Sequence, residues 1–214
     1  MISDPSERSA PVCVRQIQAF VDPEKRKEDL DCLVRAARDL GALKAAVLDA
    51  EDIRIDQTIR AKAASDDAFP SIHRPLIYPK DNIEEAIYAY QKALFFTIDP
   101  ESDMPVYGGG PILDQNHRAI YVNLFDIVSR VESAAFYMGY HLVIGLATGN
   151  CRSVFCFQEK RCAAMIKGGR CLHPYRGRPA MDAVGIDAGV LAEKHFTQPV
   201  NRDKPVLAGL VFVT

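Results

Sequence analysis

The sequence predicts an α+β or α/β fold, a single layered domain of about four strands with helices packed on them. Segments with apolar residues at helical spacing alternate with short, continuous apolar runs, which are typical of buried strands. The length of 214 residues suits one hydrophobic core, and no linker divides the chain. We expect residues 1–22 to be an N-terminal tail and residues 23–214 to be the domain.

The first predicted helix begins at Pro23 and ends at Gly41. Leu30 and Leu33 belong to an apolar stripe at helical spacing, and proline and glycine suit the two ends of a helix. The stretch "LKAAVLDAEDI", from Leu43, follows as a short buried strand and a turn.

A long irregular loop is predicted over residues 61–82, which contain three prolines and no clear period. A helix follows, capped by Asp81 or Asn82, with Glu84 and Glu85 in its first turn, where the helix dipole favours acids. Residues 93–98 then read as a strand.

The second half of the chain repeats the alternation. After the glycine-rich "YGGGP", which matches no phosphate-binding motif, residues 117–139 carry the clearest apolar helical stripe and end at Gly139. Residues 141–149 read as a buried strand that leads into the cysteines. Part of 179–196 is predicted to be helical, and 206–213 to be the last strand.

Charge and hydropathy exclude several classes of protein. The net charge is −2, so nucleic acid is not an expected partner, and no apolar run approaches the ~18–20 residues of a membrane span. The N-terminus lacks the apolar region of a secretory signal. We therefore expect a cytoplasmic protein without a membrane partner, in a compartment where structural disulfides are rare.

Four of the six cysteines lie within 21 residues, with the spacing C-x4-C-x5-C-x8-C. Four thiolates suit zinc or an iron–sulfur cluster. Structural zinc prefers ligand pairs two to four residues apart, and only the first gap fits, whereas a cubane cluster binds each thiolate at a different iron and tolerates looser spacing. The spacing favours iron–sulfur. Zinc, and cysteines that serve only as small buried hydrophobes, stay as alternatives.

The cysteine-rich segment 149–178 is also basic. Between Cys151 and Arg178 lie seven cations and a single acid, Glu159. These cations could stabilise a negatively charged cluster, or could receive an acidic redox partner or RNA; a solvated basic loop is the simplest alternative. Arg178 could also pair with Asp182 or Asp187 nearby. Outside the segment, Cys32 falls in the first helix as an expected core residue.

The stretch "CLHPYRGRPAMDAVGID" resembles the signature of the DUF2284 family of predicted metal-binding proteins. The preceding "ESAAFYMGYHLVIGLATGNC" and "NIEEAIYAYQKALFFTID" are similar to the family's earlier elements, so the resemblance extends from about Leu43 onward. It implies a cysteine-ligated metal, foremost a [4Fe–4S] cluster, and supplies no reaction.

Two departures from the family pattern matter. The cysteines here are more widely spaced. The earlier cysteine set of the family is missing from residues 60–85, where His73 is the remaining soft ligand. We therefore expect one cluster and no second.

The sequence thus predicts a protein with one [4Fe–4S] cluster that transfers electrons or supports a redox enzyme, with a redox protein as partner. The alternative is a zinc-stabilised interaction module, and a relative in which not all four cysteines bind metal is a third reading. The predicted metal ligands are Cys151, Cys156, Cys162 and Cys171, with Arg178, Asp182 and Asp187 expected to support the cofactor from behind them. Enzymatic activity, oligomeric state and the role of Cys13 are left open.

Overall fold

The computed structural model describes residues 16–17, 21–64, 87–100, 103–107, 111–166, 169–197 and 204–214. All structural statements below concern these residues. The predicted helix that begins near residue 82, most of the predicted loop 61–82, His73, Cys13 and most of the tail lie outside them.

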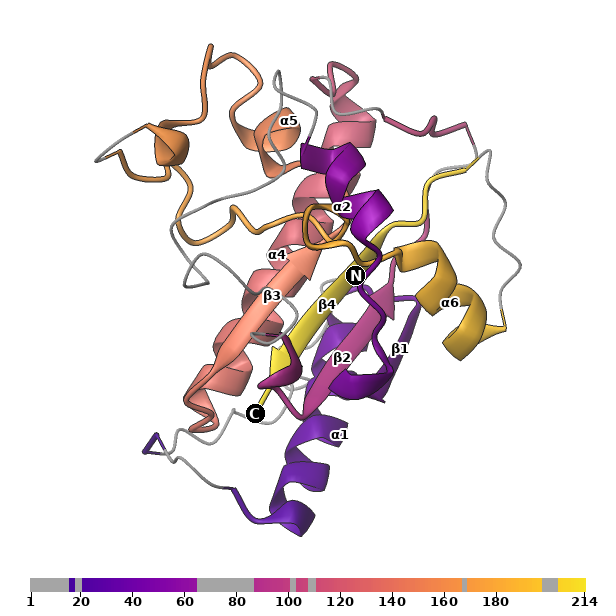
Figure 1. The fold of residues 1–214 in the computed structure, drawn as a ribbon, viewed down its shortest axis with the longest axis vertical. Coiled ribbons are helices and arrows are strands. Elements are labelled where there is room, and N and C mark those ends of the chain that lie inside the picture. Colours follow the sequence, from indigo (N-terminus) through magenta and orange to yellow (C-terminus); the bar gives the residue numbers. More distant parts are fainter. Residues whose placement is uncertain are drawn as a thin grey trace, which may run out of the picture.

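One antiparallel sheet forms the centre of the domain (Figure 1). Its strands, in spatial order, are β1 (Lys44–Asp49), β2 (Lys92–Thr97), β4 (Ala208–Val213) and β3 (Val143–Ala147). Every pair of neighbours is antiparallel, so the α+β prediction is confirmed and the four predicted strands are found. All six residues of β4 are buried, as its continuous apolar run predicts.

Helix α4 (Gln115–Tyr137) connects β2 to β3 across the central strand. Because β2 and β3 are both antiparallel to β4 between them, they run parallel to each other and form a split β-α-β unit. Asp114 caps the helix by accepting a hydrogen bond from the His117 N–H at 2.8 Å. The helix lies along the sheet beside β3 (Figure 1).

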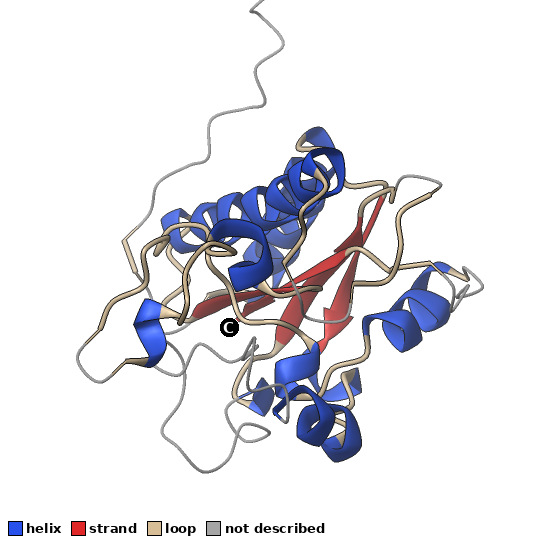
Figure 2. Cartoon of the chain, turned by 90° about the horizontal axis from the view of Figure 1, so that it is seen from above, coloured by secondary structure: helices blue, strands red, loops and turns tan. Residues whose placement is uncertain are grey.

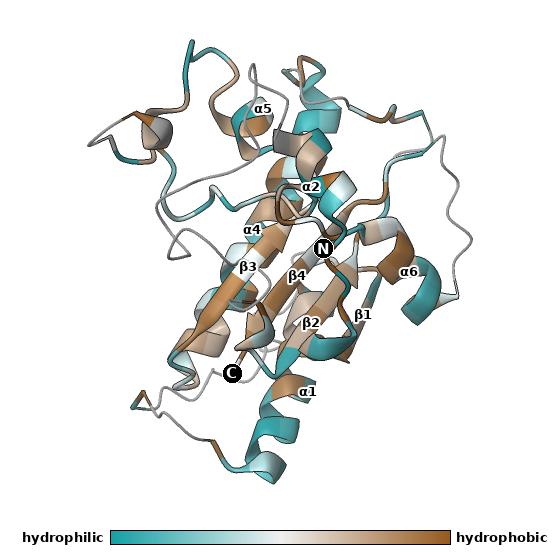
Figure 3. Ribbon diagram, viewed as in Figure 1, coloured by the Kyte–Doolittle hydropathy of each residue, from teal (hydrophilic) through white to brown (hydrophobic). Residues whose placement is uncertain are grey.

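Helices cover both faces of the sheet (Figure 2). Helices α1 (Pro23–Asp39) and α4 pack on the face that carries Leu94 and Phe96, and Cys32 packs against this core as predicted. The 3₁₀ helices η1 (Ala50–Asp52) and η3 (Asp182–Val184) and helix α6 (Ala188–Phe196) contribute to the core on the opposite face, with Phe95 and Leu210. Figure 3 shows the resulting apolar strands β3 and β4 between more polar outer surfaces.

Proline begins α1, as the sequence predicts, and an aspartate caps it. Pro23 occupies the first turn, and the Asp22 carboxylate accepts hydrogen bonds from the N–H groups of Glu24 and Lys25, at 3.0 and 3.3 Å. No helix of the described residues is long and apolar enough to cross a membrane.

The last helix begins later than the start of the predicted segment 179–196. Gly185 has a left-handed φ of 85° and separates η3 from α6. Its carbonyl accepts a hydrogen bond from the Asp56 N–H at 2.7 Å, and a Cβ at Gly185 would lie 2.7 Å from the Asp56 carbonyl oxygen. This close approach, just before helix α2 (Gln57–Ala64), demands glycine and interrupts the helix.

Candidate metal centre

The cysteine-rich segment 149–178 starts and ends beside the same residue of β3. Ala147 donates its N–H to the Pro179 carbonyl at 3.1 Å, and its own carbonyl accepts the Met181 N–H at 2.9 Å. At the start of the segment, Gly149 has a φ of 82°, and a Cβ there would lie 2.5 Å from a ring carbon of Tyr121. The segment is therefore anchored to the sheet at both ends.

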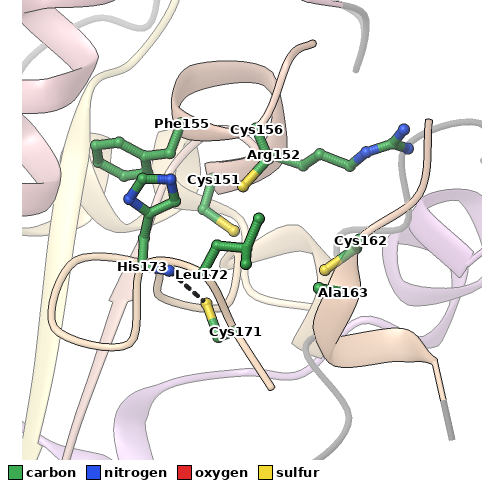
Figure 4. A pocket seen from close by; sticks show the side chains of 10 residues that line it. Cys151, Arg152, Phe155, Cys156, Cys162, Ala163, Cys171, Leu172 and His173 are labelled. Carbon is green, nitrogen blue, oxygen red and sulfur yellow. Dashed lines mark hydrogen bonds between the residues drawn. The ribbon is translucent and has the colours of Figure 1, made fainter. Parts of the chain in front are cut away.

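The four cysteines predicted to be metal ligands line one pocket (Figure 4). Cys151 begins the short helix α5 (Cys151–Phe155), Cys156 follows its end, Cys162 precedes the 3₁₀ helix η2 (Ala163–Met165), and Cys171 lies in the next loop. None of the four forms a disulfide with another described residue; Cys151 and Cys162 are buried, and the other two are half-buried. The space between these side chains is small, with room for about one water molecule, and is partly open to solvent.

The thiols of the pocket do not form a site for a single metal ion among the described residues. A tetrahedral zinc ion with Zn–S bonds of about 2.3 Å requires sulfurs about 3.8 Å apart. Among the described residues, no three His, Cys, Asp or Glu side chains form a group that could hold one metal ion. The pocket therefore gathers four sulfur donors with a space between them.

Burial and the neighbouring thiols favour the protonated forms of Cys151 and Cys156. Burial raises the pKa of Cys151 strongly, and the neighbouring Cys162, Cys171 and Cys156 raise it further. Burial also raises the pKa of Cys156, with Cys171, Cys162 and Glu159 adding to the effect and Arg152 opposing it. Four thiolates can coexist here only around positive charge, which is what a metal centre supplies.

On one side of the pocket a backbone N–H binds a sulfur and a glycine leaves space beside it. The His173 N–H donates to Cys171 Sγ at 3.4 Å. A Cβ at Gly177 would lie 3.3 Å from Cys171 Sγ and 4.0 Å from Cys151 Sγ. Any side chain at Gly177 would therefore enter the space that the two sulfurs share.

Three arginines hold the two cysteine loops in place. The Arg152 guanidinium points away from the sulfurs in Figure 4 and donates to the Glu159 carbonyl at 2.7 Å, which fixes the loop between Cys156 and Cys162. Arg176 Nε lies 2.9 Å from the Asp126 carboxylate on α4. Arg178 forms an ion pair with Glu132, also on α4.

Aromatic rings join the pocket to α4. The rings of Phe155 and His173 line the pocket with centroids 5.4 Å apart, and Phe125 of α4 meets Phe155 edge-on, also at 5.4 Å. The wall behind the sulfurs is therefore part of the hydrophobic core, which limits the movement of the loops.

The residues predicted to support the cofactor lie outside the pocket lining. Asp187 caps α6 by accepting the N–H groups of Gly189 and Val190, at 2.7 and 3.1 Å, and Asp182 is exposed at the start of η3. Arg178 pairs with Glu132 and with neither aspartate. A supporting role for these three residues stays a prediction.

Sequence reasoning missed Asp126 and Glu132. They face the cysteine loops from α4, although they lie 50 and 46 residues before their arginine partners. Acids on a helix surface are common, so only the three-dimensional packing distinguishes these two.

Comparison with known proteins supports a metal-binding family. The model of the family described as predicted metal-binding protein, DUF2284, matches residues 46–213. No curated protein matches the chain. A reductive dehalogenase, whose structure "suggests a mechanism for B12-dependent dehalogenation", has 16% sequence identity and a TM-score of 0.30, over 94% of this chain and 21% of its own. The chain spans about a fifth of that protein, and so low a similarity bears on neither fold nor function.

The family match includes all four pocket cysteines and extends from β1 to the end of β4. It agrees with the resemblance carried by the "CLHP" and "RPAMDAVGID" motifs. The chain belongs to the DUF2284 family of predicted metal-binding proteins.

Proposed function

We propose that Cys151, Cys156, Cys162 and Cys171 hold one [4Fe–4S] cluster and that the protein transfers electrons or supports a redox enzyme. One observation carries this proposal: four thiols line a common pocket, yet among the residues that the structure describes no three donors form a group for a single ion. In a cubane each thiolate binds a different iron, so the sulfurs stand farther apart than around zinc.

The chain supplies a suitable environment for such a cluster. A [4Fe–4S] cluster exchanges single electrons at a potential set by its charge, its hydrogen bonds and its exposure to solvent. The His173 N–H already donates to Cys171 Sγ, Arg152 places positive charge near Cys156, and the side chains of Phe155 and Leu172 form apolar walls.

Loading of the pocket is expected to release protons. Because the pKa values of Cys151 and Cys156 are raised, these thiols are protonated at neutral pH before metal binds. They bind metal as thiolates, so metal affinity rises with pH.

Anaerobic purification with iron and sulfide analysis tests the proposal. We expect a brown protein that absorbs broadly near ~400 nm, with about four irons and four sulfides per chain. Replacing Cys156 with Ser should remove most of the absorbance. The matched control is Cys32→Ser, because Cys32 packs in α1 away from the pocket and its loss should leave the iron content unchanged.

Two results would contradict the cluster. A colourless protein with one zinc per chain would support the zinc-stabilised module. A chain that takes up no metal, even after anaerobic reconstitution with iron and sulfide, would mean that the thiols form only an apolar pocket.

A further inference from the structure

The rim of the thiol pocket combines exposed cations with exposed apolar side chains. We define this pocket rim as Lys160, Arg161, Arg170, Ile166, Leu172 and Tyr175. The apolar members Ile166, Leu172 and Tyr175 are 53%, 57% and 86% exposed. Leu172 lines the pocket, and Arg161 and Arg170 directly precede the pocket residues Cys162 and Cys171, so these three rim residues lie close to the sulfurs.

Three cations of the rim carry unbalanced charge. Within the described part of the segment, Arg176 and Arg178 form ion pairs with Asp126 and Glu132, and Arg152 donates to the backbone carbonyl of Glu159. Lys160, Arg161 and Arg170 are exposed, and no ion pair joins them to another described residue. The chain as a whole has a net charge of −2, so this local excess of positive charge is a property of the rim.

We propose that the pocket rim is the docking surface for an acidic protein. Charge complementarity selects such a partner: its carboxylates would neutralise the three cations, while the exposed side chains of Leu172 and Tyr175 supply apolar contacts. The surface borders the proposed cluster, so the partner would be an electron-transfer protein; that identification, unlike the docking itself, rests on the proposed function.

The observations favour a protein over RNA. Binding to a nucleic acid strand relies on a groove of cations that follows many phosphates and on several stacking rings. The rim offers three unpaired cations and a single exposed ring, that of Tyr175, among its described members. Exposed apolar side chains together with a few cations are instead typical of protein interfaces.

The test uses an acidic plant-type ferredoxin and an acidic flavodoxin as probes, with the full chain prepared anaerobically. Affinity is measured by calorimetry at ionic strengths of about 0.01 M and about 0.15 M. We expect binding that weakens with salt, because exposed charges are screened over about 8 Å at the higher value. The double variant Arg161→Glu/Arg170→Glu should bind at least about tenfold more weakly, as should Tyr175→Ala.

A matched control separates local from global charge. Lys27→Glu/Arg35→Glu makes the same change in net charge on the exposed side of α1, at the opposite end of the molecule from α5 in Figure 1, and should bind as wild type. Equal weakening by both double variants would overturn the proposal, because the attraction would then be non-specific.

Two further results would also overturn docking. The first is that neither probe binds at low salt. The second is that a 20-residue polyuridine RNA binds more tightly than both proteins, and that this RNA binding is lost in the Arg161→Glu/Arg170→Glu variant. Absorbance near ~400 nm is recorded on every sample. A brown protein that binds neither probe would support the cluster and contradict the docking surface. A colourless protein that binds a probe would support the docking surface and contradict the cluster.

Discussion

Arg178, seven residues after the last cysteine, forms an ion pair with Glu132 of α4 and also donates to the carbonyl oxygens of Pro174 and Gly177, at 3.2 and 3.0 Å. The side chains of Arg178 and Glu132 are only 14% and 22% exposed, so water weakens the pair little. One arginine thus ties the loop to α4 and also stabilises the turn from Pro174 to Gly177, which lines the pocket.

Replacing Glu132 with Gln should loosen this loop. The variant leaves the Arg178 guanidinium without its counter-charge, and we expect a loss of about 1–3 kcal/mol in the free energy of unfolding, together with lower iron content. Urea unfolding measures the first and metal analysis the second. The control is Glu28→Gln, which breaks an exposed pair with Lys25 and should change stability by less than about 0.5 kcal/mol. Equal effects of the two variants would contradict the role given to Glu132.

Side chains at Gly177 should displace the cluster in order of size. A Cβ fits only 3.1 Å from the His173 carbonyl and 3.3 Å from Cys171 Sγ, so Gly177→Ala should lower the iron per chain and Gly177→Val should lower it further. Circular dichroism should show that the fold is kept, because the segment lies outside the sheet. Full iron loading of the valine variant would show that the sulfurs do not share this space.

Leu172 should protect the pocket from solvent. Its side chain lines the pocket and is also 57% exposed, so it lies between the sulfurs and water. We expect Leu172→Ala to bleach several-fold faster in air than wild type, measured by the decay of absorbance near ~400 nm. Leu142→Ala is the control, because Leu142 is 43% exposed and lies outside the pocket lining. Unchanged decay in Leu172→Ala would exclude this shielding role.

Alkaline pH should destabilise the fold through Tyr121. Burial, and secondarily Tyr107, raises the pKa of Tyr121 to about 12. The unfolded chain ionises first, near pH 10, so the stability contributed by the neutral phenol is complete below pH 10 and is lost as pH rises toward 12. We expect a slope of up to about 1.4 kcal/mol per pH unit from this residue in urea unfolding. Tyr121→Phe should lower the slope, and Tyr137→Phe, at an exposed ring, should not.

The strands were the most predictable part of the fold. The runs "ALFFT" and "AGLVFV" are apolar on consecutive residues because β2 and β4 are covered on both faces. Their neighbours could not be predicted, since the position of β4 between β2 and β3 depends on pairings such as Leu210 with Phe95 and Leu146, which lie far apart in the sequence.

The cluster of thiols was predictable for a different reason. Four cysteines within 21 residues indicate metal binding from the sequence alone, without knowledge of the fold. The residues that position the thiols carry no such signal. Asp126 and Glu132 resemble any other acids on a helix, and Gly185 reads as part of a helical stretch until its contact with Asp56 is known.

The anchoring of segment 149–178 at Ala147 has a consequence for how the family can vary. Because both ends meet at one residue of β3, the span between them is independent of how many residues the segment contains. Lengthening such a loop costs little, about 0.6 kcal/mol for each doubling. Evolution can therefore change the number of residues between the thiols without altering the sheet. The domain therefore tolerates the wide spacing of the cysteines in this chain.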